Sequence, residues 1–108
     1  MVNVREAIEQ MSLDDFAEAL APNVVWVGLW PGEHCRNRDD VLEMLARMRE
    51  RELQLRPSIV AERGDALVVN PGLDGRHHVL VLADDLVSEV RVYPDQRSAL
   101  AAVEERPW

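Results

Sequence analysis

Seven consecutive uncharged residues, Val24 to Trp30, stand between two stretches of helical periodicity. Their sequence, VVWVGLW, is rich in β-branched and aromatic side chains, which favour a strand, and Pro31 and Gly32 end it. Alternation gives this strand two apolar faces, so we expect both to be covered. One face carries Trp26, Gly28 and Trp30, and the other carries Val25, Val27 and Leu29.

Two short helices are predicted before this strand. Asn3 with Glu6, and Ser12 with Asp15, have the spacing of N-terminal caps, and Pro22 closes the pair. Apolar residues follow each cap at helical spacing. They are Val4, Ala7, Ile8 and Met11 in the first helix and Leu13, Phe16, Ala17 and Leu20 in the second.

A third helix is predicted after the strand. Asn37 can cap it, and Asp39 and Asp40 in its first turn suit the helix dipole. Its apolar stripe, which we expect to be buried, consists of Val41, Leu42, Met44, Leu45 and Met48.

The second half of the chain has the period of strands. Tight turns at Gly64–Asp65 and Asp84–Asp85 favour antiparallel neighbours. The predicted strands are Gln54–Glu62, Ala66–Asn70, Arg76–Ala83 and Leu86–Tyr93, and Asp95 can cap a last helix holding Ala99, Leu100 and Val103. Helices followed by a run of strands predict an α+β fold, with the N-terminal helices packed on one face of a curved, mostly antiparallel sheet.

Size and charge restrict the class of protein. The 108 residues suffice for one domain, residues 1–108. Twelve basic against twenty acidic residues give a net charge of −8, so we expect neither nucleic-acid binding nor association with anionic membranes. The single cysteine, with no visible signal peptide or apolar run of membrane-spanning length, indicates a cytoplasmic protein.

Three segments give the chain a resemblance to a known superfamily. They are LAPNVVWVG, HCRNRDDVLEML and LVSEVRVYPDQRSALAA. In sequence and order they resemble the nuclear transport factor 2-like superfamily, which includes SnoaL-like proteins, polyketide cyclases and ketosteroid isomerases. The resemblance implies a cone-shaped α+β barrel of the cystatin-like kind, a cavity capped by helices, and a homodimer formed by sheet faces. It leaves the chemistry open, since one fold hosts many functions.

Comparison with the catalytic residues of ketosteroid isomerases tests whether this chain could catalyse the same reaction. These enzymes use a carboxylate base at the first strand, a tyrosine from the first helices and a protonated aspartic acid on a later strand. Here Val24–Gly32 has no acid, Met1–Leu20 has no tyrosine and Arg76–Ala83 has no carboxylate. The resemblance therefore does not carry steroid-type proton abstraction to this chain.

Few polar groups are placed to face a cavity. His77 and His78 are neighbours on a strand, so one of them points inward. On the last strand, Val87, Glu89, Arg91 and Tyr93 share a face opposite the more apolar set Leu86, Ser88, Val90 and Val92. We expect the apolar set to pack under the helices and Glu89 to lie on the outer face. In the reverse register, Glu89 would be a buried carboxylate and a candidate base.

His34 and Cys35 are weak candidates for catalysis. Adjacent residues of an extended segment point apart, so a thiol–imidazole pair is not expected, and His34 is predicted at a cavity rim. No metal site is expected, because His77 and His78 would have to converge despite alternating. No motif for a bound cofactor occurs either.

Two functions remain open after these observations. The first is a site that binds a small molecule, with His34 or Glu89 as its polar group. Such a site could also serve a cofactor-independent isomerase, cyclase or hydrolase. The expected pocket residues are Trp26, Trp30, Met44, Met48 and His78. The two tryptophans suit a filled core equally well, and core is the default for the two methionines. The second function is therefore a non-catalytic, dimeric interaction module of the same fold.

Overall fold

The computed structural model describes residues 4–9, 13–28, 34–50, 58–70, 72 and 75–105. The elements follow the predicted order of two helices, a strand, a helix, four strands and a helix, which confirms the α+β class. They are α1 (Val4–Glu9), α2 (Leu13–Glu18), β1 (Leu20–Val27), α3 (Arg38–Glu50), β2 (Ser58–Arg63), β3 (Ala66–Asn70), β4 (His77–Ala83), β5 (Leu86–Tyr93) and α4 (Gln96–Glu105).

The strands form one sheet in the order β1-β5-β4-β3-β2. The β2–β3, β3–β4 and β4–β5 pairs are antiparallel, whereas β1 joins β5 in parallel. The hairpin turns have the backbone that tight two-residue turns require: φ is +59° at Gly64, 53° at Asp84 and 65° at Asp85. Glycine adopts this left-handed conformation freely, and aspartate tolerates it better than most residues do.

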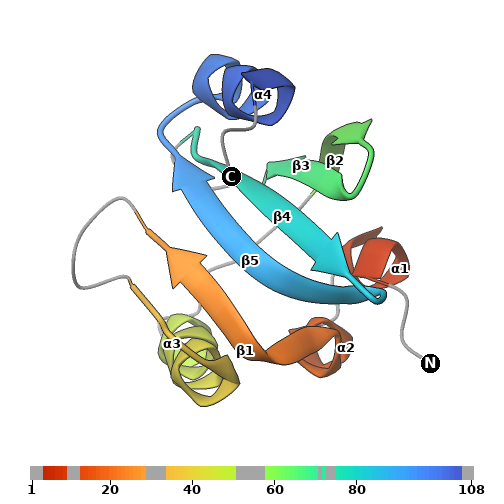
Figure 1. The fold of residues 1–108 in the computed structure, drawn as a ribbon. Coiled ribbons are helices and arrows are strands. Elements are labelled where there is room, and N and C mark those ends of the chain that lie inside the picture. Colours follow the sequence, from red (N-terminus) through yellow and green to blue (C-terminus); the bar gives the residue numbers. More distant parts are fainter. Residues whose placement is uncertain are drawn as a thin grey trace.

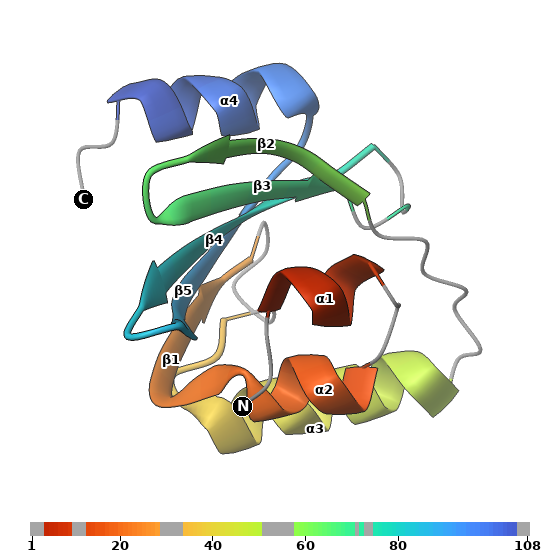
Figure 2. The same ribbon diagram turned by 90° about the vertical axis from the view of Figure 1, so that its right-hand side faces the viewer.

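Helices cover both faces of the sheet (Figures 1 and 2). The helices α1, α2 and α3 lie on the face that we call the inner face, which carries Trp26, Leu80 and Val90. Helix α4 lies across part of the opposite, outer face, where Ala99 and Val103 pack with residues of β3 and β4. The larger of the two hydrophobic clusters belongs to the inner face, so most of the core lies beneath the three N-terminal helices.

Local capping signals were predicted well. The Asn37 side-chain oxygen accepts a hydrogen bond of 2.9 Å from the Asp40 N–H, and Asp95 accepts one of 2.7 Å from the Ser98 N–H. Both helices begin at the next residue, as an N-cap requires. The caps predicted at Asn3 and Ser12 lie outside the described residues.

The start of β1 differs from the prediction. Helix α2 ends at Glu18, and Leu20, expected on its apolar stripe, is the first residue of the strand. The Val87 N–H donates to the Ala19 carbonyl over 2.8 Å, and Leu20 pairs with Val87. Pairing with β5 thus extends the strand backwards across Pro22, which was expected to separate helix from strand.

The expectation that both faces of β1 are covered was wrong. Val24 is fully buried and Trp26 is 5% exposed, but Val25 between them is 41% exposed. Helix α4 covers only part of the outer face and contacts β2, β3, β4 and β5. The outer side of β1 therefore reaches the surface in this chain.

A β-bulge changes the expected pattern of β5. Val81 pairs with Glu89 whereas the next residue, Leu82, pairs with Val87, so Ser88 is an extra residue on β5. The Ser88 hydroxyl donates to the Val81 carbonyl over 3.1 Å. Val87, expected on the outer face with Glu89, is instead fully buried in the inner-face cluster.

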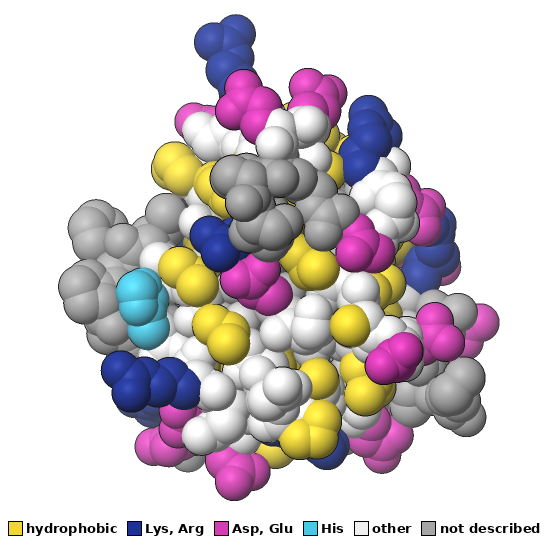
Figure 3. Space-filling view, viewed as in Figure 1, with side chains coloured by type: hydrophobic (Ala, Val, Ile, Leu, Met, Phe, Trp, Pro, Cys, Tyr) yellow, Lys and Arg dark blue, Asp and Glu magenta, His cyan; other side chains and the backbone are white. Residues whose placement is uncertain are grey.

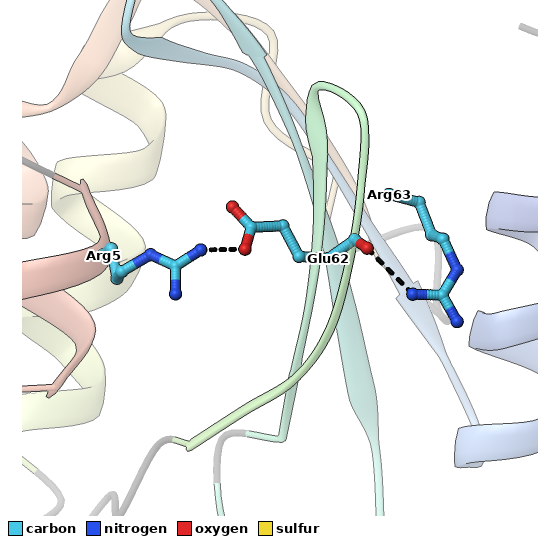
Figure 4. A network of polar contacts seen from close by, with 3 residues as sticks. All are labelled: Arg5, Glu62 and Arg63. Atoms are coloured by element: carbon cyan, nitrogen blue, oxygen red, sulfur yellow. Dashed lines mark hydrogen bonds and ion pairs between the residues drawn. The ribbon is translucent and has the colours of Figure 1, made fainter.

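Polar contacts also connect α1 to the β2–β3 hairpin (Figure 4). Arg5 of α1 forms an ion pair with Glu62, and the guanidinium of Arg63 donates to the Glu62 carbonyl over 2.9 Å. Both side chains of the ion pair are about half exposed, and such pairs contribute little to stability. Burial of Val4 and Ile8 is therefore the main force that holds α1 on the sheet.

Within the described residues, no helix has both the length and the apolar character needed to cross a bilayer.

The exposure of β1 leads to a test with neighbouring residues. Val24→Ala removes buried methyl groups, so we expect it to lower the free energy of unfolding by about 2 kcal/mol. Val25→Ala, at a 41% exposed position, should change it by less than about 0.5 kcal/mol. Urea denaturation measures both. Equal losses would mean that both faces of β1 are covered.

Candidate functional site

Trp26 is fixed to the inner face by its backbone. Its N–H and carbonyl both bond to Cys35, each over 2.9 Å, in an isolated antiparallel bridge. On its other side, Trp26 pairs with Val90 of β5. Pairing on both sides prevents the strand from rotating about its axis. The indole is 5% exposed and lies within the inner-face cluster.

His78 meets this indole from across the sheet. The ring centroids of Trp26 and His78 are 5.3 Å apart and their planes make an angle of 79°. This edge-to-face arrangement is one of the two that aromatic quadrupoles favour. The His78 side chain is partly buried.

Burial keeps the His78 imidazole neutral. Desolvation is the main cause that lowers its pKa from 6.5 to about 4, and electrostatic interactions with Arg76 and then His77 add to the effect. At neutral pH the ring therefore carries one N–H donor and one acceptor nitrogen.

His77 points to the other face. It is 5% exposed, and its Nδ1–H donates to the Gly75 carbonyl over 2.8 Å. Its Nε2 atom is buried and has no hydrogen-bond partner within the part of the chain that the structure describes. The two adjacent histidines divide between the faces as alternation predicts, and His78 is the one on the side of Trp26.

The other expected pocket residues are only partly accounted for. Met44 is half-buried and packs against the inner-face cluster. Trp30 lies outside the described residues, and so does the side chain of Met48, although its backbone belongs to α3. The structure thus brings together Trp26, His78 and the apolar cluster that includes Met44.

The segment next to Trp26 holds the two weak catalytic candidates. Cys35 is 6% exposed, and burial raises the pKa of its thiol. His34 is exposed, so the two side chains point apart as expected. The bridge from Cys35 to Trp26 could not be predicted, because a single paired residue leaves no alternating pattern in the sequence.

Glu89 lies on the outer face. It pairs with Val81 and forms an ion pair of 3.0 Å with Arg91. The sheet separates it from Trp26 and His78, so the register with Glu89 directed under the helices does not occur. Among the residues that the structure describes, no group of three or more His, Cys, Asp or Glu side chains could hold a metal ion.

Comparison with known proteins finds matches among solved structures only. No family model and no curated protein matches the sequence. A SnoaL-like protein of unknown function from Burkholderia thailandensis is 13% identical, with a TM-score of 0.65 over 84% of this chain and 87% of its own. TerC, co-crystallised with polyporic acid, is 15% identical, with a TM-score of 0.59 over 94% and 92% of the two chains. An LEH-like epoxide hydrolase from M. tuberculosis is 16% identical, with a TM-score of 0.59 over 94% and 84%.

These likenesses define the class of fold: an α+β cone in which helices pack on a curved, mostly antiparallel sheet. Within that class, the chain has the fold of the nuclear transport factor 2-like superfamily, as its sequence indicated. At these identities the comparison establishes the fold alone, and any function has to be argued from the site.

The depressed pKa of His78 makes stability depend on pH. The unfolded chain takes up a proton near pH 6.5 and the folded chain only near pH 4, so stability is lost as the pH falls through this interval. We expect His78 to contribute about 2–3 kcal/mol of that loss. His78→Phe keeps an aromatic ring beside Trp26 but cannot take up a proton. The variant should therefore lose less free energy of unfolding than the wild type as the pH falls. Urea denaturation at several pH values checks it; identical profiles for the two proteins would contradict the burial of the imidazole.

Proposed function

We propose that the inner face around Trp26 and His78 binds a small, mostly apolar molecule. The observation that carries the proposal is a neutral, partly buried imidazole that meets a fixed indole in a T-shaped contact, beside a large apolar cluster. A ligand hydroxyl or carbonyl could form a hydrogen bond with this imidazole.

The surroundings of His78 suit an apolar ligand. Trp26 offers a rigid flat surface, and the flexible thioether of Met44 adapts to irregular shapes. Trp30 and Met48 belong to the proposed set of pocket residues. Structures with this fold include one crystallised with polyporic acid and one epoxide hydrolase, so both binding and catalysis are compatible with the scaffold.

If the site is catalytic, isomerisation, cyclisation or hydrolysis without a bound cofactor fits it best. Of the two weak candidates for an acid–base role, Glu89 lies on the opposite face and His34 is exposed. Neither touches the proposed site, so binding is the better supported part of the proposal.

Ligand binding can be followed at the indole itself. In a panel of small aromatic alcohols and ketones, we expect saturable shifts of the Trp26 indole N–H signal in ¹H–¹⁵N NMR spectra. His78→Phe removes the proposed hydrogen bond and should weaken binding about tenfold. His34→Gln, at an exposed histidine, serves as the control and should bind normally. Shifts confined to surface residues, or equal affinity in His78→Phe, would contradict the site.

A second candidate function is an interaction module that pairs through the outer face. Val25 is 41% exposed there and pairs with Glu89, whose ion pair with Arg91 is only partly exposed. Figure 3 shows hydrophobic side chains between acidic and basic ones over the region where β5 and β1 lie in Figure 1. An apolar side chain beside a charge pair is suited to self-complementary contact in a homodimer.

This second function predicts a specific loss of association. Val25→Asp places a charge at the centre of the proposed contact and should raise the dimer dissociation constant at least about tenfold. Ala46→Asp, at an exposed position of α3 away from the outer face, should leave it unchanged. Sedimentation equilibrium measures both. A monomeric wild type, or a Val25→Asp variant that dimerises normally, would remove this function.

A further inference from the structure

We draw no further inference here: the strongest candidate, the exposed patch of the outer face on β1 and β5 around Val25 and the Glu89–Arg91 ion pair, belongs to the interaction surface already proposed, and nothing in the structure shows what covers it.

Discussion

The parallel pairing of β1 with β5 is the constraint on which the rest of the structure depends. It joins Trp26 to Val90 in register, while the bridge to Cys35 holds the other edge of the strand. These two sets of backbone hydrogen bonds decide which face receives the indole. Because a shift of one residue reverses every side chain of a strand, slippage here would carry Trp26 to the outer face and Val25 into the core. The contact between Trp26 and His78 exists only in the observed register.

Much of the fold could be predicted because its signals are local. Asn37 and Asp95 cap their helices through hydrogen bonds to residues three positions away, and such bonds need no tertiary context. The turns at Gly64–Asp65 and Asp84–Asp85 are equally local. The strands Ala66–Asn70 and Leu86–Tyr93 have the predicted bounds, because tight turns fix where each of them begins or ends.

The errors arise where distant segments compete with local preference. Leu20 suits the apolar stripe of a helix, but pairing with Val87 takes it into the sheet. Strict alternation from Glu89 would place Val87 on the outer face, but the bulge at Ser88 directs its side chain into the core. The exposure of Val25 depends on how far α4 extends across the outer face, which the composition of β1 does not encode. For the site, alternation could say that one of the two adjacent histidines points inward, but the choice of His78 depends on the register of β4 with β3 and β5.

The state of His78 also limits what chemistry the proposed site could support. A general base is most effective when its pKa lies near the working pH, and burial holds that of His78 at about 4. The neutral imidazole can still act as an oriented hydrogen-bond donor or acceptor, because its contact with the Trp26 ring restrains it. Such a group can bind a ligand oxygen or stabilise charge that develops on it, but it would remove a proton poorly. If the site is catalytic, the group that transfers the proton is therefore the ligand, water or a residue other than His78. It is not Glu89, because that carboxylate lies on the opposite face of the sheet.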